Sequence, residues 1–171
     1  DKEFFLKSFG IFDRPATPER FMIRVRVPGG ALNAAQAKAI ANAAIKYGKD
    51  YIDITTRMQI ELRYIAVEDI PALLRELEDA GITTYQTGID NFRNILADPL
   101  SARAEDSVID TKPIIAQMQD IFLKNPEWIS TLPRKFNTGI SGSTTNRCNI
   151  FGQDCAFVLA KKGDAYGFNL Y

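Results

Sequence analysis

Strict alternation of apolar and polar residues marks a first strand over residues 21–27. The apolar positions are Phe21, Ile23, Val25 and Val27, and Met22, Arg24 and Arg26 lie between them. A period of two is typical of a strand that buries one face. The pattern therefore predicts a strand that presents two arginines on its polar face.

A helical period follows the Pro28-Gly29-Gly30 turn. Asn33 and Gln36 have the spacing of a capping box, in which each side chain accepts from the backbone N–H of the other residue. Apolar residues then recur every three or four positions: Ala37, Ile40, Ala41, Ala44 and Ile45. We expect an amphipathic helix that ends at Gly48.

Period two returns between residues 52 and 65. Thr55, Arg57, Gln59, Glu61 and Arg63 form its polar side, and Met58, Ile60, Leu62 and Tyr64 form its apolar side. The run is long enough for one bent strand or a tight pair. A helix over 70–77 and a short strand over 83–86 follow. This order predicts an α+β fold, a ferredoxin-like split βαβ half-domain.

The pattern changes after Pro99. Residues 101–110 are polar and acidic, as in a linker, and a helix is predicted from Thr111. Its expected buried stripe is Ile114, Ile115, Met118, Ile121 and Phe122, and strands are expected over 135–140, 156–160 and 166–171. We therefore predict an N-terminal extension (1–20), a half-domain (21–98), a linker (99–110) and the opening of a second domain (111–171).

Overall charge excludes some classes of partner. The 21 Lys and Arg residues balance 21 Asp and Glu, so no net field attracts nucleic acid. No apolar run approaches the roughly 20 residues of a membrane span, and no signal peptide is evident, which favours a cytoplasmic protein without a membrane partner. The absence of an initial Met and the strand-like pattern of the last residues favour a piece of a longer protein.

Metal and hydrolytic chemistry lack their usual residues. The chain has two cysteines, Cys148 and Cys155, and no histidine. It cannot supply four thiolates for zinc or an iron–sulfur cluster, so we predict no metal site in this chain. Without histidine, the commonest general base, a hydrolytic triad is not expected.

Cationic residues recur on the predicted strands. They are Arg24 and Arg26 on the first, Arg57 and Arg63 on the second, and Arg134 and Lys135 after Pro133. A guanidinium binds carboxylates and small oxyanions through two donors, at about 1.5–3 kcal/mol for each charge-assisted contact. These residues predict an anion pocket. The alternative is a solvated sheet face on which Arg57 or Arg63 pairs with Glu61.

A series of short motifs, in one order, resembles the siroheme-dependent nitrite and sulfite reductases. The motifs are Phe9-Gly10, Arg14-Pro15, residues 24–30, Asp53-Ile54-Thr55-Thr56-Arg57, Glu68-Asp69-Ile70-Pro71, Asp90-Asn91-Phe92-Arg93-Asn94-Ile95, Ile109-Asp110-Thr111, Leu132-Pro133-Arg134-Lys135-Phe136-Asn137, and Asp154 with Ala156-Phe157-Val158. Because they extend over nearly the whole chain, the sequence is similar to the N-terminal half of this family. The resemblance is greatest to the ferredoxin-dependent assimilatory nitrite reductases.

The resemblance implies a fold and a chemistry. Two ferredoxin-like half-domains accompany a siroheme-binding α+β domain, of which residues 111–171 would be the opening. In the complete enzyme, siroheme bridged by a cysteine thiolate to a 4Fe–4S cluster reduces nitrite to ammonium, or sulfite to sulfide, with six electrons from ferredoxin. The family's cluster cysteines, spaced C-x5-C and C-x3-C, are absent here. We therefore expect no cofactor on this chain alone, and a missing C-terminal half as partner.

Site residues carry over position by position. The resemblance implies that Arg24, Arg93, Lys135 and Asn137 surround the substrate. It implies that Arg57 and Arg134 bind siroheme carboxylates, with Arg26, Gln59 and Arg63 as weaker candidates. Met58 and Glu61 depart from the family, which often has Gln at these positions.

Asn137 favours nitrite over sulfite. Sulfite reducers of this family commonly carry a second Lys there, and nitrite has one negative charge where sulfite has about two. Two alternatives stay open: a sulfite reductase of the same family, or a cofactor-free domain for siroheme binding or assembly. A face that normally meets the missing half could also form a homodimer.

Overall fold

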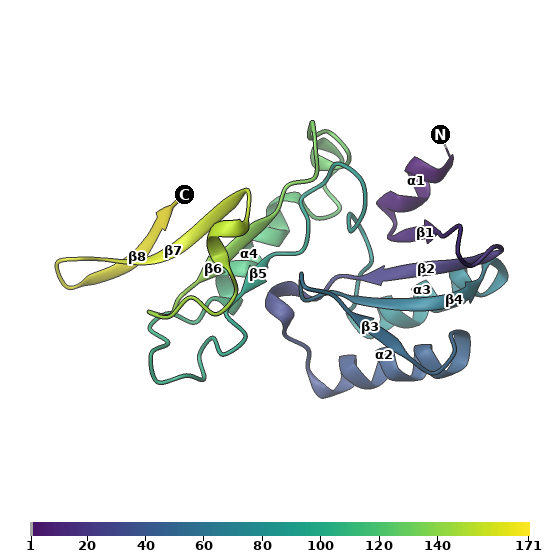
Figure 1. Ribbon diagram of the computed structural model, residues 1–171, viewed down its shortest axis with the longest axis horizontal. Helices are drawn as coiled ribbons and strands as arrows, with labels where there is room; N and C mark the ends of the chain where they lie inside the picture. Colours follow the sequence, from purple (N-terminus) through teal and green to yellow (C-terminus); the bar gives the residue numbers. More distant parts are fainter. Residues whose placement is uncertain (1) are drawn as a thin grey trace.

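Two four-stranded sheets organise the chain, whose computed structural model describes residues 2–171 (Figure 1). The α+β class is confirmed. Short 3₁₀ turns occur at Pro28–Gly30, Val67–Asp69, Pro126–Trp128 and Ile150–Gly152. Within residues 2–171, no helix combines the length and apolar character that a membrane span requires.

The first sheet is antiparallel throughout, in the order β1-β2-β4-β3. Its strands are β1 (Ile11–Asp13), β2 (Arg20–Val25), β3 (Ile52–Ile54) and β4 (Ile60–Ala66). Helix α1 (Lys2–Ser8) precedes β1. The register between β2 and β4 shifts once, between Phe21 and Ile23, and then pairs Arg24 directly with Glu61.

Two helices cover one face of this sheet (Figure 1). Helix α2 (Ala34–Tyr47) begins with the predicted capping box of Asn33 and Gln36 and ends at Gly48. Helix α3 (Ile70–Asp79) buries Ile70, Leu73 and Leu77. The sequence predictions of both helices are confirmed, and their apolar stripes form one core with β2 and β4.

Of the two alternatives for residues 52–65, the tight pair is correct, and the strand predicted over 83–86 is wrong. The run over 52–65 is a tight pair, β3 and β4, and Met58 has a φ of 56° in the turn between them. The alternation that placed Thr55 to Arg63 on one face is therefore interrupted. Residues 83–86 are not a strand, because Gln86 has a φ of 55°, which ends an extended run. The N-terminal strand β1 pairs with β2 instead.

The second sheet has the order β5-β6-β7-β8, with two parallel pairs and a final antiparallel pair. Its strands are β5 (Leu96–Ala97), β6 (Thr138–Ser141), β7 (Cys155–Lys162) and β8 (Ala165–Leu170), and its helix is α4 (Lys112–Phe122). Ile115 and Phe122 enter its core, but Ile121 is 64% exposed, so its place in the predicted stripe was wrong. The β7–β8 hairpin extends away from the rest of the molecule (Figure 1).

Arg26 joins the two parts. Its guanidinium donates to the carbonyl oxygens of Tyr85, Gln86, Phe92 and Arg93, at 2.8–3.2 Å. Asn94 adds a bond to the carbonyl of Val27, at 2.7 Å. Arg26, which directly follows β2 and was expected on its polar face, therefore lies in the interior, 2% exposed.

Candidate anion-binding site

Three arginines from separate segments lie close together. Arg24 is on β2, Arg57 is in the turn after β3, and Arg93 is in the loop before β5. Arg24 and Arg93 each donate through Nη1 to the same oxygen, the carbonyl of Thr87, at 3.4 and 2.7 Å. The two nitrogens can therefore be no farther apart than the sum of these distances.

Like charges in this cluster affect one another. Burial, followed by the charges of Arg24 and Arg57, lowers the pKa of Arg93 to about 10. Burial and then Arg24 also lower the pKa of Arg57. Both guanidinium groups keep their charge at neutral pH. The fold thus concentrates positive charge at one place in a chain whose overall charge is balanced.

The Arg24 guanidinium is fixed in orientation. Its Nε and Nη2 donate to Oε1 of Glu61, at 3.0 and 2.8 Å. Its central carbon lies 4.5 Å from the centroid of the Phe12 ring, a cation–π contact. The Arg93 guanidinium is fixed by a second carbonyl, that of Ile89, at 2.7 Å from Nη2.

The segment that contains Lys135 and Asn137 runs beside Arg93. The backbone N–H of Arg93 donates to the carbonyl of Phe136 at 2.9 Å, within a parallel bridge between Phe92 and Phe136. The rings of Phe92 and Phe136 meet edge to face, with centroids 5.4 Å apart. Because neighbours of a bridged residue point to the opposite side, Arg93, Lys135 and Asn137 share the side away from these rings.

Asp154 links this segment to the arginines. Its carboxylate accepts from the backbone N–H of Asn137 at 2.8 Å. Its charge partly offsets the lowering of the Arg57 pKa by burial and by Arg24. The side chains of Arg134 and Lys135 are exposed and have no hydrogen bond or ion pair with any described residue. The structure thus brings Arg24, Arg57, Arg93 and Asn137 together. The side chains of Arg134 and Lys135 are not held by a polar contact with a described residue.

Two of the three weaker candidates, Arg26 and Arg63, are bonded inside the protein. Arg26 is buried and bonds four carbonyls, which is a structural role and differs from the cofactor role that the sequence implied. Arg63 pairs with Asp53 at 2.6 Å and with Glu61 at 2.8 Å, the ion-pair alternative that the sequence left open. Gln59 is buried, 2% exposed.

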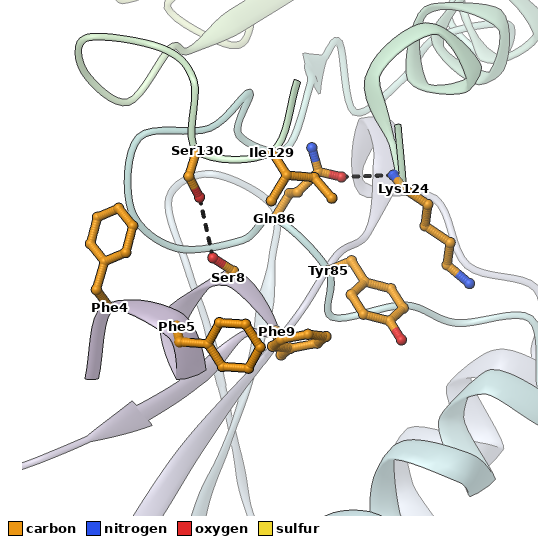
Figure 2. Close-up of a pocket in the computed structure, with 9 residues that line it drawn as sticks. All are labelled: Phe4, Phe5, Ser8, Phe9, Tyr85, Gln86, Lys124, Ile129 and Ser130. Atoms are coloured by element: carbon orange, nitrogen blue, oxygen red, sulfur yellow. Dashed lines mark hydrogen bonds between the residues drawn. The ribbon is translucent and has the colours of Figure 1, made fainter. Parts of the chain in front are cut away.

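A separate apolar cavity of about 550 Å³ lies between α1 and the loop at residues 129–130 (Figure 2). The residues that line it are Phe4, Phe5, Ser8, Phe9, Tyr85, Gln86, Lys124, Ile129 and Ser130. None is a predicted site residue, and the ammonium of Lys124, the one charged group of this lining, is paired with Glu78 at 2.9 Å. The cavity therefore offers no free charge to an anion.

Siroheme, an anion with eight carboxylates, fits the donors left without a partner in the arginine cluster and at one further position. Arg57 Nε, Gln59 Nε2, Arg93 Nε and Asn137 Oδ1 are buried and have no hydrogen-bond partner among the described residues. A buried polar group left without a partner costs about 1–3 kcal/mol, so these positions favour an external polar ligand. Three of the four atoms are N–H donors, which is the donor type that carboxylates accept.

An iron–sulfur cluster does not fit this chain. Residues 2–171 hold no group of three or more His, Cys, Asp or Glu side chains arranged for a metal. Burial raises the pKa of both thiols, and the charge of Asp98 adds to this effect at Cys148. Both are therefore less suited than free thiols to act as thiolate ligands.

Sequence reasoning missed two parts of the cluster. It did not find the Thr87 carbonyl that Arg24 and Arg93 share, because a backbone acceptor has no signature in the sequence. It left open the pairing of Glu61 with Arg63, but it did not find the pairing of Glu61 with Arg24. The register of β2 against β4 brings in Arg24.

Two family models match consecutive parts of the chain. The nitrite/sulfite reductase ferredoxin-like half domain matches residues 14–80, and the nitrite and sulphite reductase 4Fe-4S domain matches residues 88–171. Together they cover most of the sequence. Their junction, between residues 80 and 88, falls in the loop that follows α3.

Relatives and solved structures agree with these matches. The chain is 40% identical to a ferredoxin–nitrite reductase of Leptolyngbya laminosa and 34% identical to the chloroplastic one of Spinacia oleracea, over 99% and 96% of its own length. It covers 34% and 29% of those two proteins, so it spans about a third of the relatives it matches. The NirA protein of Mycobacterium tuberculosis is similar in structure, with a TM-score of 0.84 and 27% identity over 96% of this chain and 33% of that one.

A dissimilatory sulfite reductase shares the fold, with a TM-score of 0.71 at 16% identity over 85% of this chain and 34% of that one. The confirmed α+β fold, the order of the two matched domains and the identity over the whole chain agree with one another. The chain belongs to the nitrite/sulfite reductase family.

Proposed function

We propose that this chain is the N-terminal part of an oxidoreductase that carries siroheme and a 4Fe–4S cluster and reduces nitrite to ammonium with electrons from ferredoxin. The observation that carries the proposal is the cluster of Arg24, Arg57 and Arg93. In this cluster the buried Nε groups of Arg57 and Arg93 have no hydrogen-bond partner among the described residues. The names of its relatives, ferredoxin–nitrite reductases, support the substrate and the electron donor. The remainder of the protein, which we place in the cytoplasm, would supply the cluster cysteines.

The chain's own residues would have two tasks. Arg24 and Arg93, with Lys135 and Asn137 on the adjacent segment, bind the anionic substrate and stabilise charge on its oxygens as N–O bonds break. Arg57 and Arg134 hold carboxylates of the siroheme. When bound, siroheme supplies the iron that accepts electrons and coordinates the substrate. Burial of these arginines strengthens each contact, because water screens it less.

Substrate choice would follow from the number of cations. Nitrite is a monoanion and sulfite approaches a dianion, so a site with Asn137 instead of a second lysine suits nitrite better. A sulfite reductase of the same family is the second candidate, because both matched models include sulfite reductases. The ratio of kcat/KM for nitrite and sulfite in the complete protein decides between them.

The proposal is tested by Arg93→Ala in the complete protein, with a one-electron dye as donor. Loss of a preorganised donor to a developing anion should lower kcat/KM for nitrite by about a hundredfold or more. Arg75→Ala, which removes an exposed arginine of α3, is the matched control and should leave kcat/KM unchanged. Equal effects of both substitutions would refute the assigned site. A complete protein without siroheme, iron or sulfide would instead support the cofactor-free alternative.

A further inference from the structure

Charged residues form a continuous row across three strands of the first sheet. The register places Arg24 of β2 opposite Glu61 of β4, and Glu61 opposite Asp53 of β3. Arg63, two residues along β4, lies between the two acids and donates to both. Adjacent carboxylates on paired strands repel each other, and the Arg63 guanidinium offsets that repulsion.

Glu61 is the only acid of this row that contacts the cluster of Arg24, Arg57 and Arg93 among the described residues. One of its oxygens accepts from Arg24 twice, at 3.0 and 2.8 Å, and the other accepts from Arg63 at 2.8 Å. Its side chain is 8% exposed, so solvent screens its charge weakly. Asp53 is 42% exposed and is separated from Arg24 by Arg63 and Glu61.

We propose that Glu61 is a positioning residue that orients Arg24 and also sets the charge of the anion site, so that the site prefers a monoanion to a dianion. The inference rests on the proposed function, because it assumes that Arg24 faces the substrate. A fixed negative charge beside the cluster reduces the attraction for any anion. The reduction is twice as large for a dianion, since electrostatic energy scales with the product of the charges.

The hydrogen bonds of Arg24 support the orienting role of Glu61. Glu61 engages Nε and Nη2, and the Thr87 carbonyl accepts from Nη1 at 3.4 Å. Because Glu61 holds one edge of the Arg24 guanidinium, the orientation of the remaining N–H groups is fixed. A glutamine at position 61 could still accept from Arg24 but would carry no charge, so it separates orientation from charge.

The test measures binding of nitrite and of sulfite to the complete protein by calorimetry, at mildly alkaline pH where sulfite is a dianion. Glu61→Gln should raise affinity for sulfite relative to nitrite by about tenfold, the size expected for one weakly screened charge near the site. Asp53→Asn removes the same charge from the exposed end of the row and should change the ratio by less than about twofold. Glu61→Asp keeps the charge and should keep the ratio near that of the wild type.

Each result bears on the inference separately from the proposed function. A wild-type protein that binds neither anion contradicts the proposed function itself. A wild type that binds both, with an unchanged ratio in Glu61→Gln, overturns only the role of Glu61. If Glu61→Gln does not fold, Arg63→Gln applies the test in reverse, because loss of a positive charge should lower the sulfite-to-nitrite affinity ratio. A rise in that ratio would overturn the inference.

Discussion

The two sheets bury very different amounts of apolar surface and hold their cations differently. Among the residues that the structure describes, the first sheet and its helices share a core of fifteen buried apolar residues, whereas the core around β6 and α4 has five. Arg24 and Arg93 have two or more acceptors each, while the side chains of Arg134 and Lys135 have none among the described residues. The part of the proposed site formed by Arg24 and Arg93 is thus preorganised, and the part formed by Arg134 and Lys135 is not.

This difference has an energetic meaning. Apolar burial contributes about 25 cal/mol per Å², so the larger core supports its surface residues more firmly. Side chains that are held in place lose less entropy when a ligand binds. Under the proposed function, Arg24, Arg57 and Arg93 are ready for the anion, and Arg134 and Lys135 become ordered only when the cofactor or the remaining chain arrives.

The largest effect is expected where the two regions are joined. Arg26→Met would leave four carbonyls without their donor and should destabilise the protein by about 3–5 kcal/mol. Arg20→Met, at the exposed first position of β2, is the control and should cost less than about 0.5 kcal/mol. Denaturant unfolding measures both. Similar midpoints for the two variants would contradict the joining role of Arg26.

A second test asks whether the two cores are separate cooperative units. Leu62→Ala removes a fully buried side chain from the first core, at a cost of about 2–5 kcal/mol, and Ile140→Ala does the same in the second. Native-state hydrogen exchange should show the loss of protection mainly in the sheet that carries each substitution. A uniform loss over both sheets would show that the molecule unfolds as one unit.

The third substitution lies in the segment before β6. In the complete protein, Asn137→Lys adds a cation beside Arg93 and should shift the ratio of kcat/KM values from nitrite toward sulfite. The expected shift corresponds to about 1–3 kcal/mol, the size of one charge-assisted contact. Arg93→Ala should impair both substrates. If Asn137→Lys leaves the ratio unchanged, Asn137 does not determine substrate choice.

Elements with strong local signals were predictable from the sequence. The capping box of Asn33 and Gln36 and the stripes of α2 and α3 gave the helices, because caps and periodicity are local properties. Strand β1 was not predicted, because three residues are too few to show a periodicity and the strand forms by pairing with β2. Residues 83–86 looked extended, but the positive φ of Gln86 is set by tertiary contacts.

The candidate site was predictable in part. Family motifs pointed to Arg24, Arg57 and Arg93, which the fold brings together. Periodicity could not separate Arg24 from Arg26, because both fall on the polar side of the predicted strand. In the structure Arg24 is partly exposed and Arg26 is buried. The predicted domain boundaries and the homodimer remain predictions.

The smallest effect is expected from the acid group that anchors the segment after β6. Hydrogen bonds from Thr145 and Arg147 lower the pKa of Asp106 to about 2. The stabilisation is therefore complete above the unfolded pKa, roughly 3.9, and is lost as the pH falls toward 2. The difference in Tm between the wild type and Asp106→Asn should be present at neutral pH and vanish near pH 2. A difference that is independent of pH would contradict this assignment.

The central claim is that Arg24 and Arg93 form the substrate side of an anion site. The most direct measurement is a crystal structure of the complete protein with siroheme and nitrite bound. The account predicts guanidinium nitrogens of both arginines within hydrogen-bond distance of the nitrite oxygens, with Glu61 still bonded to Arg24. Nitrite bound elsewhere, with both guanidinium groups directed away from it, would contradict the claim.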